Sequence, residues 1–250
     1  CADCVAGKAP ASAHKRLSSS SSPSSLSKPV IHTDYCFLHT GDGEAPANAS
    51  PVLVVKAKPC NSFAAFFCPS KGVLHSWSAA QLSKILLSFG YRDFVVHSDN
   101  EASLKALVEA AVSLLPPSRQ AVHELSPAEQ HESNGVAERA CQTIQGQCRT
   151  LLSSLERNLG KTIPPNHAIL AWMIRHAGWL IHRFHVVRST GLTAFTSVRG
   201  RPYSRVVPMF GCPFFHRLRQ VAGKLKARWQ EGVYLGSSDE TIDHYVYDIK

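Results

Sequence analysis

The order of strand-type and helix-type segments between residues 30 and 185 constrains the fold of this chain most strongly. Strand-type runs, rich in β-branched and aromatic residues, cover residues 30–38, 52–56, 63–68, 93–97 and 120–125. Runs with apolar residues at helical spacing cover residues 76–90, 104–115, about 134–159 and about 165–185. Three strands, a helix, a strand, a helix, a strand and then helices predict an α/β fold, with helices packed on a mixed five-stranded sheet.

Short-range signals mark the ends of two of these helices. The hydroxyl of Ser76 is expected to cap the first helix. Gly90 is expected to end it, because glycine readily adopts the left-handed conformation that follows many helices. Pro116 ends the second helix, because proline lacks the N–H that a helix interior requires.

Composition divides the chain into three parts. Residues 1–27 include eight serines between positions 18 and 27. A segment of this composition cannot bury enough apolar surface to fold, which indicates a flexible linker. Residues 28–190 hold the alternating segments of the core. Residues 191–250 end in short aromatic and β-branched runs, which predict a small, basic, β-rich appendage after the core.

The overall composition is that of a globular protein from a reducing compartment. Of its 250 residues, 44% are hydrophobic and 18% are charged, and no stretch approaches the ~20 apolar residues of a membrane span. The N-terminus has no apolar segment of a secretion signal. Eight cysteines are too few for a disulfide scaffold. We therefore expect neither secretion nor association with a membrane.

Positive charge is concentrated in the C-terminal half. Residues 1–138 carry 11 Lys and Arg against 12 Asp and Glu, a net charge of −1. Residues 139–250 carry 16 against 6, a net charge of +10. An arginine-rich excess of this size favours a polyanion such as nucleic acid as partner. The alternative is a generic basic surface that only aids solubility.

Two aspartates stand where strands favour apolar residues. Asp34 lies inside the first strand-type run, and Asp99 follows the fourth. A strand interior disfavours aspartate, and a buried carboxylate needs a partner or a metal ion. Neighbouring strands can bring two acids together, and a third acid from a helix start would complete an oxygen-rich site for a hard divalent cation. The alternative is that each aspartate caps a turn or a helix.

The long helix that begins near residue 134 carries a polar stripe. Glu138, Gln142, Gln145 and Arg149 recur at helical spacing and share one side of it. A stripe with an acid in its first turn and a cation further along could lie along a DNA backbone. It could equally be an ordinary solvated helix face, because the helix dipole also favours an acid near the N-terminus.

Three motifs at these positions resemble the signatures of copia-type LTR retrotransposon integrases, a retroviral-like family. They are Ile-His-Thr-Asp at 31–34, Val-His-Ser-Asp-Asn at 96–100 and Ser-Asn-Gly-Val-Ala-Glu-Arg at 133–139. The resemblance implies an RNase H-like core whose Asp, Asp and Glu triad binds Mg²⁺ or Mn²⁺ as a two-ion site. It assigns both the catalytic and the metal-binding roles to Asp34, Asp99 and Glu138.

The resemblance extends to both sides of the core. Cys1 and Cys4 resemble the end of the family's His-His-Cys-Cys module, which implies half of a Zn²⁺ site. The segments that resemble the parts after the core are 190–195, 210–212, 232–236 and 245–248. The chain departs from the family at Glu101, where glycine is common, and after Arg139, where further basic residues are common.

The resemblance implies an enzyme that processes the 3′ ends of element DNA and transfers them into target DNA. Its partners would be DNA and further copies of itself, in the nucleus or in a cytoplasmic virus-like particle of the host cell. The residues expected to contact nucleic acid are Asn134, Arg139, Gln142, Gln145, Arg149, Lys224, Lys226 and Arg228. The alternatives are an RNase H-like nuclease or transposase, and a degenerate element-derived protein that only binds nucleic acid.

Two histidines accompany the aspartates. His32 and His97 each precede an aspartate by two residues, so strand alternation puts each on the same sheet face as that aspartate. We expect ordinary hydrogen-bonded strand histidines, and the alternative is that they support the metal site.

Overall fold

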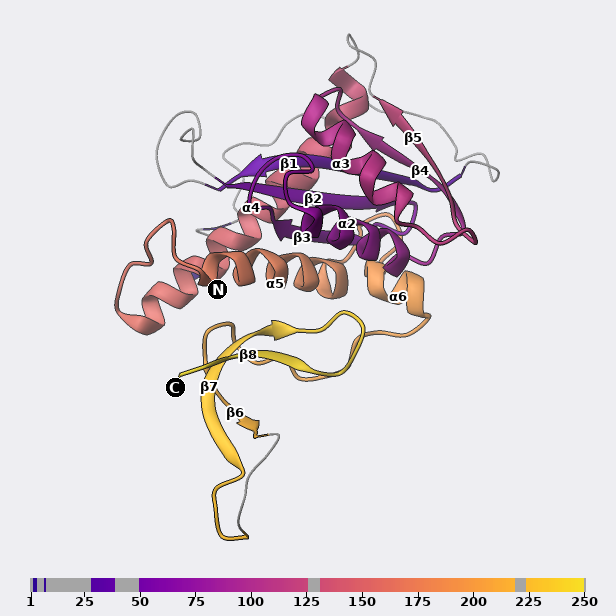
Figure 1. The fold of residues 1–250 in the computed structure, drawn as a ribbon. Coiled ribbons are helices and arrows are strands. Elements are labelled where there is room, and N and C mark those ends of the chain that lie inside the picture. The colour runs from indigo at the N-terminus through magenta and orange to yellow at the C-terminus, as the bar shows by residue number, and fades with distance from the viewer. Residues whose placement is uncertain are drawn as a thin grey trace.

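The described residues of the chain form two β-sheets, with helices around the larger one (Figure 1). The structure, a computed structural model, describes residues 2–3, 7, 28–38, 50–125, 131–218 and 224–249, with the backbone alone at 131–134. The predicted half zinc site, Cys1 and Cys4, lies outside the described residues, as does the side chain of Asn134. No helix in the described ranges is long and apolar enough to cross a membrane.

The larger sheet combines antiparallel and parallel strands. Its strands are β1 (Val30–Phe37), β2 (Pro51–Lys58), β3 (Phe63–Phe67), β4 (Asp93–Ser98) and β5 (Gln120–Leu125). They lie in the order β3-β2-β1-β4-β5. β1 and β3 pair antiparallel with β2, whereas β4 pairs parallel with both β1 and β5. This topology confirms the mixed five-stranded sheet of an RNase H-like fold.

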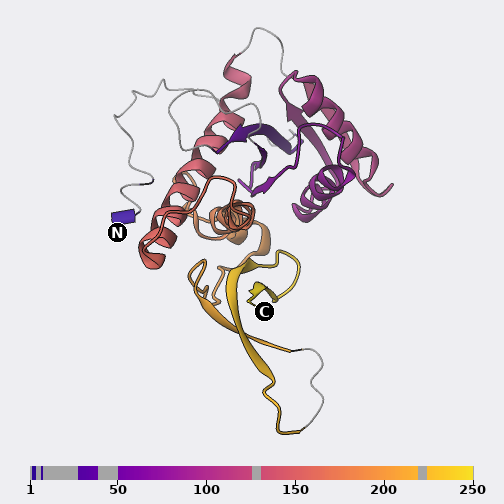
Figure 2. The ribbon, with the colours of Figure 1, turned by 60° about the vertical axis from the view of Figure 1, so that its left-hand side comes forward.

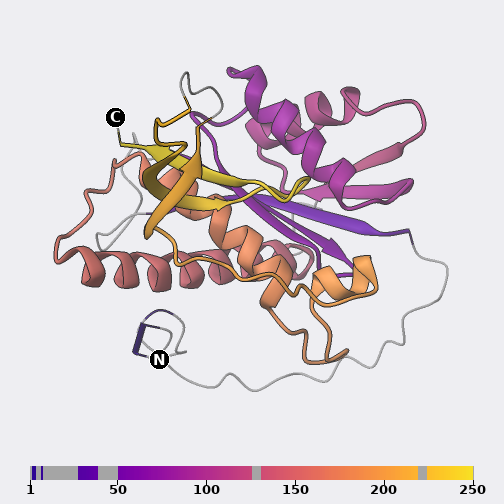
Figure 3. The same cartoon turned by 90° about the horizontal axis from the view of Figure 1, so that it is seen from below.

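Helices cover both faces of this sheet (Figures 2 and 3). They are α2 (Ser76–Ser88), α3 (Ala102–Ser113), α4 (His131–Leu159), α5 (Ile169–Phe184) and the short α6 (Ala194–Arg199). Side chains of a strand alternate between the faces. Ile31 and Tyr35 accordingly pack in the core under α2 and α3, and Cys36 packs in the core under α4 and α5. Asp34 therefore lies on the face that α4 covers.

Glycine at one position lets α5 approach β3 closely. An added Cβ at Gly178 would stand 2.7 Å from the backbone nitrogen of Ala65. Any side chain at this position would collide with the strand backbone, which cannot move aside without disturbing the sheet. This close approach forms one wall of the core that also holds the inner side of α4.

A smaller antiparallel sheet is attached to α5. Its strands are β6 (Pro213–Arg217), β7 (Trp229–Ser237) and β8 (His244–Asp248), which confirms the predicted β-rich appendage. Two arginines of α5 reach the carboxylate of Asp239, with N–O distances of 2.9 Å for Arg175 and 3.3 Å for Arg183. Nε1 of Trp179, on the same helix, donates to the backbone oxygen of Ser238 at 3.3 Å. These contacts hold the small sheet against the core.

The start of α2 differs from the sequence prediction. The helix begins at Ser76 itself, with His75 in the N-cap position and no side-chain hydrogen bond there, so the predicted capping role of Ser76 is wrong. The serine cannot cap because its own backbone is already helical. Gly90 follows the helix with a φ of 82°, the left-handed conformation that was expected of it.

Two other helix starts also differ, and one helix was not predicted. α4 begins at His131 rather than near residue 134, and α5 begins at Ile169 rather than near residue 165. The chain turns at Pro164 and Pro165, and Nδ1 of His167 accepts the N–H of Ile169 at 3.2 Å. The helix α6 was not predicted; Thr193 caps it by accepting the N–H of Thr196.

Candidate active site

The two aspartates come from neighbouring parallel strands. In the pairing of β1 with β4, Thr33 stands opposite Ser98, so the next residue on each strand path is an aspartate. Paired strands lie ~4.8 Å apart. The register therefore brings Asp34 and Asp99 to the same end of the β1–β4 ladder, as the sequence predicted.

Both aspartates are held in the same way by their own backbone. Oδ1 of Asp34 accepts the N–H of Tyr35 at 2.7 Å, and Oδ1 of Asp99 accepts the N–H of Asn100 at 2.8 Å. In the described part of the chain, neither Oδ2 accepts a hydrogen bond. One oxygen of each carboxylate is thus fixed, which leaves the second to a ligand.

The surroundings of Asp34 disfavour its negative charge. Burial raises the pKa of Asp34 to about 6. The Tyr35 hydrogen bond and the charge of Lys71 act in the opposite direction, and the charges of Asp99 and Glu101 add to the rise of this pKa. Asp34 forms no ion pair with any cation in the described ranges. Carboxylate oxygens without a counter-ion are ligands that hard divalent cations such as Mg²⁺ and Mn²⁺ prefer.

Glu138 lies on α4 near the same strands. α4 packs over β1 and β2, and Cys141, one helical turn beyond Glu138, contacts Cys36 of β1. The neighbouring Cys36 thiol raises the pKa of the Cys141 thiol, and burial raises it further. The charges of Asp34 and Glu138 contribute to the same rise, so Cys141 lies close to both acids.

Glu138 does not complete a metal site in this conformation. Its side chain is exposed to solvent. Among the residues that the structure describes, no three His, Cys, Asp or Glu side chains are placed to hold one metal ion. Asp34 and Asp99 fit a divalent cation by their oxygen donors and their position, and the third ligand stays a prediction. Glu138 must turn toward Asp34 for the triad to form.

The two strand histidines contact each other. The ring centroids of His32 and His97 are 5.3 Å apart in an edge-on arrangement, on the face that carries Asp34. Burial lowers the pKa of His32 to about 4, and the charges of His97, Lys58 and Lys56 lower it further. Nδ1 of His32 is buried and has no hydrogen-bond partner among the described residues. His32 is therefore a neutral strand histidine, without the hydrogen bond that the sequence predicted for it.

The predicted DNA-contacting residues of α4 differ in their surroundings. Arg139 and Gln142 are exposed. Gln145 is half-buried, and its amide donates to a backbone oxygen of β1 at 3.4 Å. Nε of Arg149 donates to the backbone oxygen of Gly7 at 3.3 Å. Arg139 and Gln142 are thus the members of this set that solvent reaches without competing contacts to other segments.

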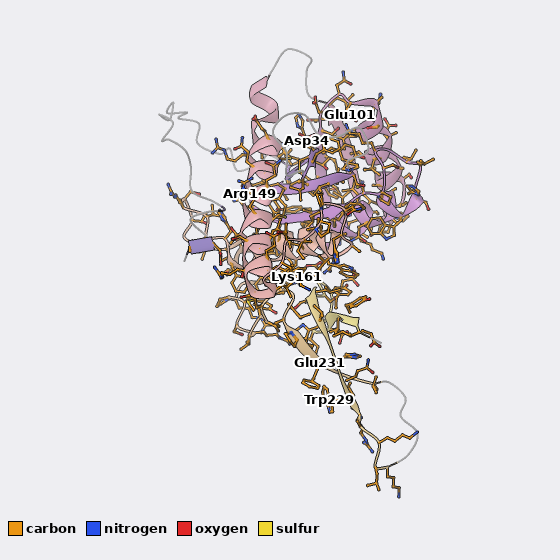
Figure 4. All side chains as sticks on the ribbon, turned by 90° about the vertical axis from the view of Figure 1, so that its left-hand side faces the viewer. Asp34, Glu101, Arg149, Lys161, Trp229 and Glu231 are labelled. Carbon is orange, nitrogen blue, oxygen red and sulfur yellow. The ribbon has the colours of Figure 1, made fainter. Side chains whose placement is uncertain are left out.

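The other predicted DNA-contacting residues lie on the small sheet. Lys224, Lys226 and Arg228 are exposed on the segment that leads into β7. Figure 4 shows Trp229, the first residue of β7, on the part of this sheet that extends away from the core and from Arg149. The structure therefore does not bring the two basic sets together.

Sequence reasoning missed an ion pair beside the aspartates. Lys71 and Glu101 form an ion pair of 2.8 Å, and both influence the charge of Asp34. The sequence singles out Glu101 only as a departure from the family's glycine, two residues beyond Asp99, and not as the partner of a cation. Lys71 lies 30 residues away from Glu101 in a connecting segment, and no local pattern marks it.

Comparisons with known proteins gave similarity at the level of structure. No family model and no curated protein matches the chain. A chain in a cryo-EM structure of a simian T-cell lymphotropic virus intasome, in complex with the PP2A regulatory subunit B56 gamma, is similar at 16% identity and a TM-score of 0.47. That similarity covers 82% of this chain and 68% of the other.

Two catalytic core domains of viral integrases are similar as well. The HTLV-2 integrase core in complex with magnesium, in its trimeric form, has 16% identity to this chain and a TM-score of 0.45. The similarity covers 68% of this chain and 95% of the HTLV-2 chain. The BIV integrase core has 14% identity and a TM-score of 0.43, and the similarity covers 68% of this chain and 93% of the BIV chain. Similarities this distant carry no information about activity or about individual residues.

Proposed function

We propose that this chain is the integrase of a copia-type LTR retrotransposon, a polynucleotidyl transferase that joins element DNA to target DNA. The observation that carries the proposal is the register of β1 and β4, which brings Asp34 and Asp99 together. Asp34 has no ion-pair partner among the described residues, as expected of an acid that binds a cation. The motifs around these aspartates and around Glu138 supply the family.

The proposed reaction consists of two transfers at phosphorus. In the first, the oxygen of water attacks a phosphodiester near a 3′ end, and the terminal nucleotides leave, so that the element strand ends in a 3′-hydroxyl. In the second, this hydroxyl attacks a phosphodiester of the target and displaces a target 3′-hydroxyl. Bound Mg²⁺ or Mn²⁺ would activate the attacking oxygen and stabilise the leaving one. Asp34, Asp99 and Glu138 would hold these ions.

The remaining assignments follow from this function. Arg139 on α4, and Lys224, Lys226 and Arg228 before β7, would bind phosphates of element and target DNA, since all four are exposed cations. The protein would act as a homo-oligomer that pairs two DNA ends, in the nucleus or in a cytoplasmic virus-like particle. Cys1 and Cys4 would contribute to a Zn²⁺ site only together with two further ligands.

A strand-transfer assay in Mn²⁺ tests the proposal. The donor is a labelled duplex with a free 3′-hydroxyl, and the target is supercoiled plasmid. We expect joined product from the wild-type chain and none above background from Asp99→Asn. Glu109→Gln, which changes an exposed acid of α3, is the matched control and should join DNA like the wild type. Equal amounts of joined product from the wild type and from Asp99→Asn would contradict the proposal.

The second candidate function is nucleic-acid binding without catalysis. The exposed Glu138 and the net charge of +10 over residues 139–250 favour it. Binding would then persist in chelator, weaken steeply with salt and be unchanged in Asp99→Asn. Cleavage of the RNA strand of a hybrid duplex, without joining of DNA, would instead indicate an RNase H-like nuclease. A cut-and-paste transposase would excise the donor segment before joining it.

A further inference from the structure

The ammonium group of Lys71 joins three segments around the aspartates. Lys71 follows β3, and its Nζ lies 2.8 Å and 2.9 Å from the two carboxylate oxygens of Glu101. The same Nζ lies 5.5 Å and 5.4 Å from the ring centroids of Tyr35 and Phe37 on β1, within the range of cation–π attraction. Tyr35 directly follows Asp34, so the ammonium links the strand of Asp34 to the residue before α3.

Further contacts hold the two ends of this link. The hydroxyl of Ser103 donates to the Glu101 carboxylate. The N–H of Gly72, next to Lys71, donates to the hydroxyl of Tyr35 at 3.0 Å. An isolated surface ion pair contributes little to stability. Here the pair is bidentate and supported on both sides, so it restricts where the connected segments can lie.

The position of Glu101 determines the position of Asp99. β4 ends at Ser98 and α3 begins at Ala102, so Asp99, Asn100 and Glu101 are the whole connection between them. A connection this short, fixed at its far end, leaves Asp99 little freedom relative to β1. Figure 4 shows Glu101 and Asp34 at the same end of the core, with Arg149 further along α4.

We infer that Lys71 is a positioning residue for the aspartate pair: through Glu101 it holds the connection that carries Asp99 against the end of β1, next to Asp34. The inference rests on the proposed function, because it takes Asp34 and Asp99 to share a divalent cation. Lys71 itself touches neither the ion nor the DNA in this role. It acts on metal binding only through the distance between the two aspartates.

Charge and position predict opposite effects when Lys71 is removed. If Lys71 acted only by its charge, Lys71→Ala would tighten the binding of a divalent cation, because a repelling cation would be gone. If it acts by position, Lys71→Ala weakens that binding, because the aspartates lose their spacing. Residues that orient metal ligands typically change metal affinity by about 10- to 100-fold. The sign of the change therefore separates the two roles.

The experiment is a Mn²⁺ titration of the full chain, with free Mn²⁺ measured by electron paramagnetic resonance. We expect Lys71→Ala and Glu101→Gln to weaken binding about tenfold. Lys71→Arg should recover binding to within about threefold of the wild type, since it keeps both the ion pair with Glu101 and the cation beside the Tyr35 and Phe37 rings. Lys84→Ala, an exposed lysine of α2, is the control and should bind normally.

Two sets of results separate the inference from the proposed function. Unchanged or tighter binding by Lys71→Ala, or no recovery in Lys71→Arg, overturns the inference while the metal site stands. Wild-type chain that binds no Mn²⁺, or binds it equally well after Asp34→Asn, overturns the proposed metal site and the inference with it. Thermal unfolding of each variant identifies a loss of folding. If Lys71→Ala does not fold, Mn²⁺ binding by Lys71→Arg and by Glu101→Gln decides whether Lys71 acts by position.

Discussion

Cys141 on α4 packs against Cys36 on β1. Both side chains are buried in the core between the sheet and the pair α4 and α5. Cys36 follows Asp34 by two residues, and Cys141 follows Glu138 by three. This contact therefore fixes the distance between the backbone of the third predicted metal ligand and that of the first, and leaves the Glu138 side chain to rotate.

We expect Cys36 and Cys141 to resist alkylation by iodoacetamide at about pH 8 in the folded chain. Burial shields both sulfurs, and the neighbouring Cys36 thiol together with burial raises the pKa of Cys141, so the reactive thiolate of Cys141 is scarce. Mass spectrometry of peptides after brief labelling measures the rate, with urea-unfolded chain as reference. Labelling of either cysteine as fast as in the unfolded reference would contradict the packing of α4 on β1.

Asp34 reduces the stability of the metal-free chain at neutral pH. Its pKa rises on folding from the ordinary 3.8 to about 6, mainly through burial. The stability contributed by this group is fully present below pH 3.8 and is lost as the pH rises through about 6. We expect Asp34→Asn to raise the free energy of unfolding at pH 7 by ~1–2 kcal/mol, because solvent reduces the ~1.4 kcal/mol that one pKa unit is worth.

Urea denaturation in chelator measures this effect at two pH values. The gain of Asp34→Asn over the wild type should be present at about pH 7 and nearly absent at about pH 4. Glu109→Gln, an exposed acid of α3, should show no gain at either pH. If Asp34→Asn is no more stable than the wild type at neutral pH, the surroundings of Asp34 do not destabilise its charged carboxylate.

His176 makes the chain sensitive to acid. It is 2% exposed, and its ring stacks on those of Trp179 and Phe210 with centroid distances of 5.7 and 5.4 Å. Burial lowers its pKa from 6.5 to about 4, and the neighbouring arginines of α5 contribute. The stability contributed by the neutral ring is present above pH 6.5 and is lost as the pH falls through about 4.

His176→Phe should therefore flatten the acid side of the stability profile. We expect the variant to lose ~1–2 kcal/mol less than the wild type between about pH 7 and pH 5. Urea denaturation across this interval gives both profiles. Parallel profiles would show that the ring already carries its proton, or is open to water, in the folded chain.

Gly178 should not tolerate a side chain. Its added Cβ would meet the backbone of Ala65 at 2.7 Å, so we expect Gly178→Ala to cost ~1–3 kcal/mol, as overpacking of a core does. The matched control is Gly135→Ala on α4, where nothing lies within 4 Å of the added Cβ. The control should be neutral or gain up to ~1 kcal/mol of helix propensity. Equal effects of the two substitutions on thermal unfolding would refute the close approach of α5 to β3.

Helices and strands that are delimited by clear turn signals in the sequence were predictable. The strand predicted at residues 120–125 has the same bounds as β5, because a proline pair and a polar loop delimit it. The start of α5 was not predictable to this accuracy, because its first free N–H is taken by the ring of His167 rather than by a usual capping residue. α6 is too short for helical periodicity to reveal it.

The candidate site was predictable in its aspartates and less so beyond them. Asp34 leaves a signal because acids are rare inside strands, and Asp99 because it directly follows the end of one. Their common position follows from the β1–β4 register. The direction in which Glu138 points depends on side-chain torsions of an exposed residue, which periodicity does not determine. The Lys71–Glu101 pair depends on a contact between segments 30 residues apart and leaves no local pattern.

The central claim is that Asp34, Asp99 and Glu138 form one metal site. A crystal structure of the full chain with Mn²⁺, located by its anomalous scattering, tests this most directly. We predict Mn²⁺ in contact with the carboxylates of Asp34 and Asp99, and Glu138 turned from solvent to join them. Mn²⁺ bound elsewhere, or an empty aspartate pair with Glu138 still exposed at saturating Mn²⁺, would contradict the claim.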